Sequence, residues 1–181
     1  MKDLKQFIKT TIREFLNENN TKILNKSFNL TLDDVEYIYS DWDVEMLDTD
    51  EQDDLKKTII NFMKTGFSVD SNGKLLGVEN FPETIKLYRL IQVDNPNKIN
   101  IDNLGIHWTL NKKTLYNDNF LGQIGISFDS YEDLYIIEGV FQRKQVDIIS
   151  TIIHQMSNEI ENEITTYKQE KPKIYKIFKY K

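Results

Sequence analysis

The spacing of apolar residues changes once along the chain, close to Gly66, and this change limits the folds that the chain can adopt. Ahead of it, apolar side chains recur every three or four residues, which is the spacing of one helix face. This pattern predicts helices over residues 1–17, 31–39 and 50–64. Beyond Gly66, the apolar runs are short and rich in β-branched and aromatic residues, as in strands. The chain is therefore expected to begin with helices and to continue as a sheet.

Six strands are expected after an irregular hairpin or loop over residues 68–82. Their expected ranges are 85–93, 105–110, 123–128, 134–142, 161–167 and 174–180. One helix interrupts them at residues 147–157, with Asp147 placed to cap it. This order favours an α+β fold, with N-terminal helices followed by a mostly antiparallel, split β-sheet core with one inserted helix. At 181 residues, one compact domain is expected, in which a helical segment (1–80) packs on a β-rich core (81–181).

The composition excludes several kinds of chemistry. The chain has no cysteine, which excludes disulfides, thiolate metal sites and cysteine nucleophiles. It has two histidines, His107 and His154, and no His-Glu-x-x-His motif, so we expect no metal site. Glycine-rich nucleotide-binding loops and the Gly-x-Ser-x-Gly elbow are also missing from the sequence. Carboxylate chemistry remains after these exclusions.

Hydropathy and charge indicate where the protein works. No apolar run reaches the roughly 18 to 20 residues that a membrane-spanning helix needs, and the N-terminus lacks the apolar block of a signal peptide. We therefore expect a cytoplasmic protein without a membrane partner. The formal net charge of −6 argues against general affinity for nucleic acid. The chain lacks alanine and has 3 arginines beside 20 lysines, a bias typical of an AT-rich genome such as that of a low-GC bacterium or its phage. The sequence does not determine the oligomeric state.

The negative charge is concentrated between Asp33 and Asp54, which enclose 11 acidic residues and no basic one. The stretch lacks the EF-hand pattern, so a calcium loop is not expected. It is either a solvated acidic surface or a surface that attracts a basic partner. By contrast, residues 168–181 hold six lysines and one glutamate. Their apolar residues predict a last strand, in which the lysines protect an exposed sheet edge.

Arg89 is the first of three candidate site features. It lies inside an apolar strand, where alternation puts it on the face opposite Tyr88 and Leu90. A buried guanidinium needs partners such as carboxylates or phosphate. The alternative is an edge-strand arginine that reaches solvent or forms a structural ion pair.

Two further motifs follow in the second half of the chain. In residues 105–109 (GIHWT), His107 and Thr109 share one face of a short strand and can hydrogen-bond ribose or amide groups. The alternative is a core tryptophan beside a satisfied histidine. In residues 159–164 (EIENEI), Glu161 and Glu163 project to one side of a strand, about 7 Å apart. There, one carboxylate can orient a nucleophile while the other stabilises a cationic centre; the alternative is an exposed strand face or a frayed helix end.

Taken in order, the three motifs resemble those of the arginine–serine–glutamate class of mono-ADP-ribosyltransferases, which includes bacterial toxins and phage-encoded enzymes. Leu87-Tyr88-Arg89 resembles the first strand of the family, in which an aromatic residue often precedes the arginine. Residues 105–109 resemble the Ser-Trp-Thr version of the second motif, and residues 146–164 resemble the stretch that leads into Glu-x-Glu. The resemblance covers about residues 85–167. It implies an ADP-ribosyltransferase-like α+β fold that uses NAD as a substrate.

The resemblance implies a role for each candidate residue. Arg89 would contact a phosphate or ribose of NAD, and Thr109, together with His107, would hold the strand around the nicotinamide ribose. Glu163 would accept a hydrogen bond from the ribose 2′-hydroxyl and stabilise the oxocarbenium-like state as nicotinamide departs. Glu161 would position or deprotonate the acceptor. The resemblance favours an arginine side chain of a protein as acceptor, a host protein if the enzyme is phage-encoded.

One position departs from the family pattern, because His107 stands where serine is usual. Either His107 makes the equivalent hydrogen bond, as a histidine does in the other major branch of ADP-ribosyltransferases, or the chain is a degenerate transferase without turnover. A different interpretation is a non-enzymatic protein whose acidic stretch binds a basic partner or mimics DNA. The positions of Arg89, Thr109 and Glu163 in the fold distinguish these hypotheses, since an enzyme needs them in one cleft.

Overall fold

A computed structural model of the protein describes residues 49–123, 133–157, 162–168 and 170–180. Several sequence-based expectations concern residues outside these ranges. They are the helices over 1–17 and 31–39, the strand over 123–128 apart from its first residue, most of the acidic stretch, and Glu161.

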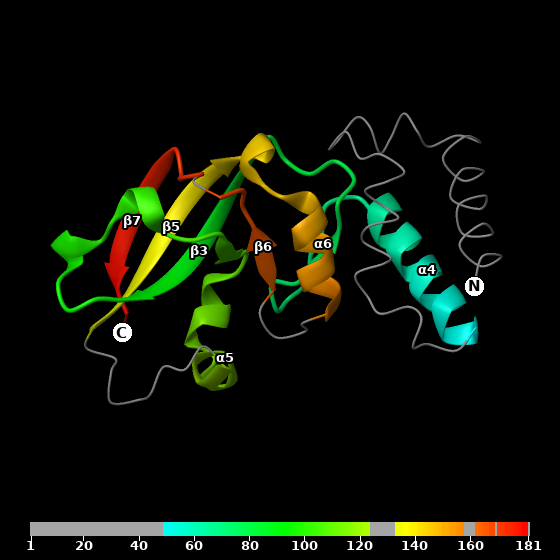
Figure 1. The fold of residues 1–181 in the computed structure, drawn as a ribbon, viewed down its shortest axis with the longest axis horizontal. Coiled ribbons are helices and arrows are strands. Elements are labelled where there is room, and N and C mark those ends of the chain that lie inside the picture. Colours follow the sequence, from blue (N-terminus) through cyan, green and yellow to red (C-terminus); the bar gives the residue numbers. More distant parts are fainter. Residues whose placement is uncertain (1–48, 124–132, 158–161, 169, 181) are drawn as a thin grey trace. The chain divides into compact units, whose positions relative to one another are not determined.

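A five-stranded antiparallel sheet forms the larger part of the described chain (Figure 1). Its strand order is β6-β4-β3-β5-β7. The strands are β3 (Thr84–Gln92), β4 (His107–Thr109), β5 (Leu134–Gln142), β6 (Glu163–Thr165) and β7 (Ile174–Lys179). Together with the helices, this sheet confirms the α+β class. The expected strand over 134–142 is confirmed with its bounds, whereas β4 and β6 are shorter than expected.

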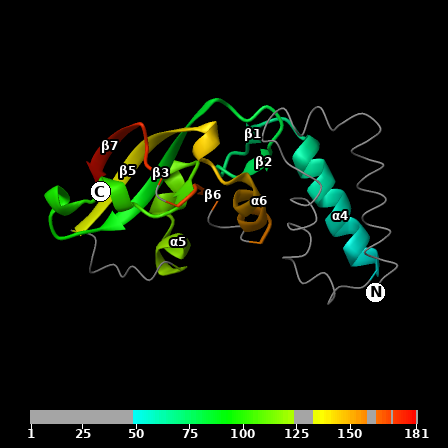
Figure 2. The ribbon, with the colours of Figure 1, turned by 45° about the horizontal axis from the view of Figure 1, so that its top comes forward.

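The described residues fall into two compact units. One contains residues 49–68 and 76–81, with helix α4 (Thr49–Lys64), whose Ile59 and Met63 are buried. The other contains residues 69–75 and the described residues from Pro82 onward, and it holds the five-stranded sheet. Two short strands, β1 (Ser68–Val69) and β2 (Leu75–Gly77), form a separate sheet in the expected hairpin region (Figure 2).

Each face of the five-stranded sheet has its own apolar contacts. Tyr88 and Leu90 of β3 pack against one buried cluster, which confirms that they share a face. The cluster consists of Leu115, Phe120, Leu121, Leu134, Ile136 and Tyr180. It includes residues of two short helices that the sequence analysis did not predict, η5 (Lys112–Tyr116) and α5 (Asp118–Gln123). On the other face, Trp108 of β4 packs edge-on against Phe141, with ring centroids 4.8 Å apart.

Helix α6 (Ile148–Ser157) is the inserted helix that the isoleucine stripe predicts. Asp147 caps it as expected, because its carboxylate accepts a hydrogen bond from the backbone N–H of Ser150 at 3.1 Å. Ile148 and Ile152 are buried. In both ribbon views α6 runs beside β6, the last strand at that side of the sheet (Figures 1 and 2).

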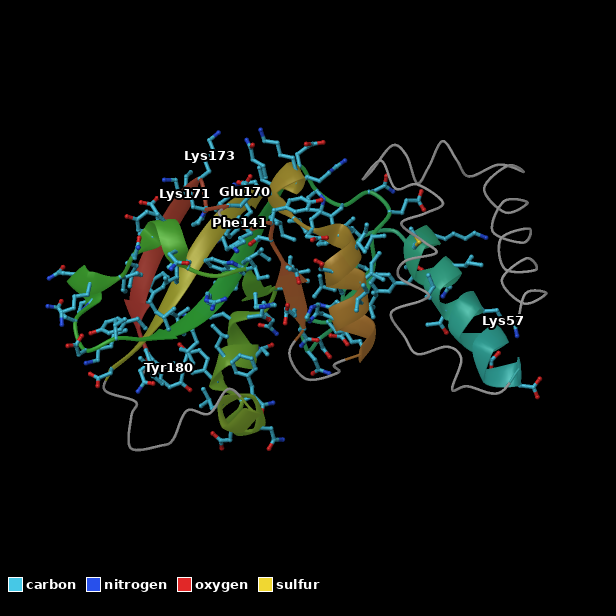
Figure 3. The ribbon with its side chains drawn as sticks, viewed as in Figure 1. Lys57, Phe141, Glu170, Lys171, Lys173 and Tyr180 are labelled. Atoms are coloured by element: carbon cyan, nitrogen blue, oxygen red, sulfur yellow. The ribbon has the colours of Figure 1, made fainter. Side chains whose placement is uncertain are left out.

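Strand β7 forms the opposite edge of the sheet, since it pairs only with β5. Lys171 and Lys173 lie near the start of β7 and Tyr180 follows its end (Figure 3). Ile174 and Tyr175 are exposed. The predicted lysine-flanked edge strand is therefore confirmed. Among the described residues, no helix has the length and apolar character needed to span a membrane.

Candidate functional site

The three sequence motifs lie on three neighbouring strands. Arg89 is in β3, His107 and Thr109 form the ends of β4, and Glu163 begins β6. In the sheet, Thr109 is paired with Tyr88 on one side and with Glu163 on the other. Residues that are far apart in sequence thus meet in one short section of the sheet.

Glu163 is buried, with a relative exposure of 6 %, so the interpretation of this motif as an exposed strand face is wrong for this residue. Its Oε1 accepts a hydrogen bond from the Thr165 hydroxyl at 3.0 Å and is also hydrogen-bonded to Nδ1 of His107. Nδ1 of His154 lies 3.5 Å from the same oxygen. Within the described part of the chain, these contacts all reach Oε1 and none reaches Oε2. The carboxylate is therefore held through one of its two oxygens.

The main chain around Glu163 is fixed as firmly as its side chain. Gln155 of α6 donates a hydrogen bond from Nε2 to the carbonyl oxygen of Glu163 at 2.6 Å. Just before the strand, Asn162 adopts a left-handed conformation with φ of 46°, which asparagine tolerates better than most residues. Its side-chain amide donates to the carbonyl oxygen of Asn72 at 3.0 Å. Contacts on both sides of the residue thus set the direction in which the carboxylate points.

Arg89 is half-buried and has few partners. Its Nη1 donates to the backbone oxygen of His107, whereas Nε is buried with no hydrogen-bond partner. A guanidinium has five N–H groups, so most of its donors are unused by the described residues. Burial lowers the pKa of Arg89 below its usual value, and the negative charge of Glu163 raises it in part. Arg89 is therefore a partly desolvated cation with donors to spare.

Gly105 makes room for the guanidinium of Arg89. A Cβ atom at position 105 would lie 2.8 Å from Nη2 of Arg89 and 3.0 Å from its Cζ, so the guanidinium would have to shift to admit it. The backbone of Gly105 also has φ of 76°, a left-handed conformation that favours glycine. Both features explain why a glycine precedes the β4 motif.

Thr109 has a local role in this geometry. Its side chain is buried, and its hydroxyl accepts a hydrogen bond from the backbone N–H of Asn111 at 3.4 Å. Its cross-strand neighbour is Glu163. The threonine therefore packs beside the carboxylate, while its hydroxyl supports the turn that follows β4.

Helix α6 contributes to this site, although its isoleucine-rich pattern predicts only a packing role. Thr151, His154 and Gln155 are spaced i, i+3 and i+4, so they share one face of the helix. Thr151 and Gln155 are buried. The Thr151 hydroxyl accepts from the backbone N–H of Thr165 at 3.0 Å, so this polar face bonds to the edge strand β6 instead of to water. In the sequence, the polar stripe of this otherwise isoleucine-rich helix is the feature that indicates such a polar contact.

The same helix brings the two histidines of the chain together. The rings of His107 and His154 have centroids 5.5 Å apart, and both flank Glu163. His107, His154 and Glu163 each offer a ligand atom, and these atoms lie within 4.8 Å of one another. From composition alone, two histidines predict no metal site, but in the fold both meet at a buried carboxylate.

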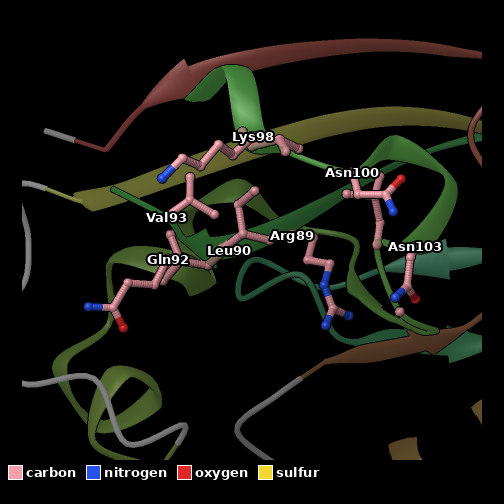
Figure 4. A pocket seen from close by; sticks show the side chains of 11 residues that line it. Arg89, Leu90, Gln92, Val93, Lys98, Asn100 and Asn103 are labelled. Carbon is pink, nitrogen blue, oxygen red and sulfur yellow. The ribbon is translucent and has the colours of Figure 1, made fainter. Parts of the chain in front are cut away.

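A cavity of about 520 Å³ adjoins Arg89. Figure 4 shows its polar lining residues, which include Arg89, Lys98, Asn100 and Asn103. Gly105 also belongs to the lining, whereas His107, Thr109 and Glu163 do not. Lys98 is engaged by Asp94 at 2.8 Å. Arg89 lines the cavity, and the negative charge of Glu163 raises its pKa in part. The strand register places Glu163 on the face of Tyr88, whereas Arg89 lies on the opposite face of β3.

Comparisons of the chain with models of known protein families, with curated proteins and with solved structures find no match.

Proposed function

We propose that this chain is an NAD-dependent mono-ADP-ribosyltransferase that modifies a protein side chain and releases nicotinamide. The observation that carries the proposal is the combination of Glu163 and Arg89. A buried carboxylate is fixed at one oxygen, and its negative charge raises the pKa of a guanidinium that keeps unused donors. The motif strands β6, β4 and β3 are also adjacent in the sheet, which supports an ADP-ribosyltransferase-like core.

The carboxylate suits the cationic part of the reaction. In the proposed step, the bond between C1′ of the ribose and the nicotinamide nitrogen breaks, and its electron pair leaves with nicotinamide. Positive charge then develops on the ribose, and Glu163 stabilises it while Oε2 accepts from the 2′-hydroxyl. The contacts at Oε1 keep the carboxylate in place without occupying Oε2. The nucleophile of the acceptor forms the new bond to C1′ and loses a proton to the solvent or to a nearby base.

The guanidinium suits the phosphate part of the substrate. A diphosphate offers several oxygen acceptors, and the forked donors of arginine match such a group. Arg89 uses one donor for His107 and lines a cavity of about 520 Å³, which is within the usual volume range of ligand pockets. We therefore assign the cavity beside Arg89 to the part of NAD remote from the nicotinamide, and Glu163 to the reacting ribose.

His107 takes the place of the serine in this proposal. Its Nδ1 is bonded to Glu163, so it orients the carboxylate as a hydroxyl at that position would. The same bond is compatible with a degenerate transferase, and only turnover separates the two possibilities. The non-enzymatic alternative rests on the acidic stretch between Asp33 and Asp54, which lies mostly outside the described residues. Arg89 lines the cavity without Thr109 and Glu163, so the described residues do not form the single cleft that an enzyme needs. The transferase proposal rests instead on the adjacent motif strands and on the buried carboxylate of Glu163.

The test is modification of proteins in a bacterial extract. The chain is incubated with NAD and the extract, and mass spectrometry searches for peptides that carry ADP-ribose. Wild type should modify a small set of proteins, and Glu163→Gln should modify none. Glu138→Gln is the matched control, because Glu138 is a half-buried strand carboxylate that pairs with Lys86 at 3.3 Å instead of with the site. The proposal fails if wild type adds no ADP-ribose and leaves NAD intact.

A further inference from the structure

The two histidines and the buried glutamate form a group that the proposed transferase reaction does not require. His107 comes from β4, His154 from α6 and Glu163 from β6. Their ligand atoms lie within 4.8 Å of one another, and Nδ1 of His154 is 3.5 Å from Oε1 of Glu163. Three separate elements thus aim two imidazoles at one carboxylate.

These distances are close to those of a metal centre. In a tetrahedral site with metal–ligand bonds of about 2.0–2.1 Å, neighbouring ligand atoms are roughly 3.3 Å apart. The 3.5 Å between Nδ1 of His154 and Oε1 of Glu163 fits this spacing. Nδ1 of His107 is hydrogen-bonded to the same oxygen, so it has to move away from that oxygen for both groups to bind one metal. The side chains of His107 and His154 are 49 % and 40 % exposed, so their rings can adjust and an ion can enter from the solvent.

The donor set also selects the kind of metal. Two imidazole nitrogens and one carboxylate oxygen suit zinc and its neighbours among the divalent transition metals, whereas Mg²⁺ and Ca²⁺ prefer oxygen ligands alone. The carboxylate has a supporting contact of its own, the hydrogen bond from Thr165 at 3.0 Å. Such contacts orient a ligating side chain before the metal arrives.

We propose that His107, His154 and Glu163 bind one divalent transition-metal ion of the zinc class, with a further coordination position open to water or a ligand. This binding is separate from the proposed transferase activity, and it competes with that activity because both use the Glu163 carboxylate. Zinc bound at Oε1 neutralises the negative charge that Glu163 supplies to the developing cation on the ribose. The chain therefore carries a metal-dependent means of blocking its own proposed active site.

The experiment measures metal binding without NAD, so its result does not depend on the transferase proposal. The full chain, free of any histidine tag and treated with a chelator, is titrated with Zn²⁺ by calorimetry and with Co²⁺ by visible spectroscopy. We expect one ion per chain, and an intense Co²⁺ spectrum typical of low coordination numbers with nitrogen ligands. Because the chain has two histidines and no cysteine, no other side chains supply such ligands.

Variants locate the ion. His154→Gln and His107→Gln should each weaken binding at least tenfold, whereas Glu138→Gln should not change it. Circular dichroism of the metal-free variants checks that they are folded, and His154 is a partly exposed helix residue whose replacement the fold should tolerate. The proposal is overturned if wild type binds no ion at millimolar Zn²⁺. It is also overturned if both histidine variants bind as wild type does, because the ion then sits on acidic side chains elsewhere.

Discussion

The guanidinium of Arg89 donates a hydrogen bond to the backbone oxygen of His107. The register between β3 and β4 consists of one residue pair among the described residues, Tyr88 with Thr109. The backbone oxygen of His107 therefore accepts its hydrogen bond from the side chain of Arg89 instead of from the backbone of β3. The arginine therefore contributes to the sheet and to the candidate site at once. Changes that move Arg89 should consequently alter both stability and ligand binding.

Gly105→Ala is expected to displace Arg89. The added Cβ would lie 2.8 Å from Nη2 of Arg89, and the left-handed backbone of residue 105 disfavours alanine. The backbone effect should lower the free energy of unfolding by about 1–2 kcal/mol, and loss of the Arg89 position should weaken NAD binding at least tenfold. Urea unfolding and calorimetric titration with NAD measure the two effects.

Gly66→Ala is the control for this prediction. The nearest heavy atom to a Cβ at position 66 is the backbone oxygen of Glu79 at 4.0 Å, and the φ of Gly66 is not in the left-handed region. This variant should keep wild-type NAD binding and lose little stability. If Gly105→Ala binds NAD as tightly as Gly66→Ala does, Arg89 is not part of the ligand site.

Thr151→Val should detach helix α6 from the edge of the sheet. The valine keeps the shape of threonine, but it leaves the buried N–H of Thr165 without its acceptor. An unsatisfied buried donor costs about 1–3 kcal/mol, and urea unfolding should show a loss of that size. Thr84→Val serves as the control, because Thr84 is an exposed residue of the same unit. Equal effects of the two substitutions would contradict the role given to Thr151.

Tyr88 should make the stability of the protein depend on alkaline pH. Burial and the nearby charge of Glu138 raise the pKa of Tyr88 above its usual value of 10.0, against a smaller lowering effect of Lys86. The folded protein therefore holds the phenolic proton more tightly than the unfolded chain does. The protonated phenol therefore contributes stability that is fully present below about pH 10 and is lost as the pH rises through the pKa of Tyr88 in the folded protein.

The measurement compares wild type with Tyr88→Phe. The free energy of unfolding in urea is followed from about pH 8 to about pH 11. Wild type should lose stability more steeply than Tyr88→Phe at the alkaline end, because phenylalanine has no proton to release. If the free energies of unfolding of the two proteins fall in parallel with pH, Tyr88 has the same pKa in the folded and unfolded protein, and the prediction is wrong.

Local sequence patterns predicted the longer elements well. The periodicity in β3, β5 and α6 extends over nine or ten residues, so a few exceptions do not hide it. The short helices η5 and α5 were missed because their five or six residues hold too little periodic information. Contacts with the sheet, such as that of Leu115 in the buried cluster, hold them in place.

The candidate site was predictable only in part. Arg89, His107 and Glu163 were selected from short motifs, and the sheet brings their strands together. His154 was not selected, because a polar residue on an apolar helix normally faces water. Here the exposed edge of β6 needs hydrogen-bond partners, and the polar face of α6 supplies them. Strand order and helix placement are long-range properties that local patterns do not contain.

Release of nicotinamide from NAD tests the central claim most directly. Wild type, Glu163→Gln and Glu138→Gln are compared at equal concentration, and the glutamine at position 163 retains hydrogen-bonding capacity toward Thr165 and His107. Removing a group that stabilises transition-state charge typically slows an enzyme at least about 100-fold. We therefore predict nicotinamide release by wild type and Glu138→Gln, and a loss of this size in Glu163→Gln. Release by Glu163→Gln at the wild-type rate, or none by wild type, would contradict the account.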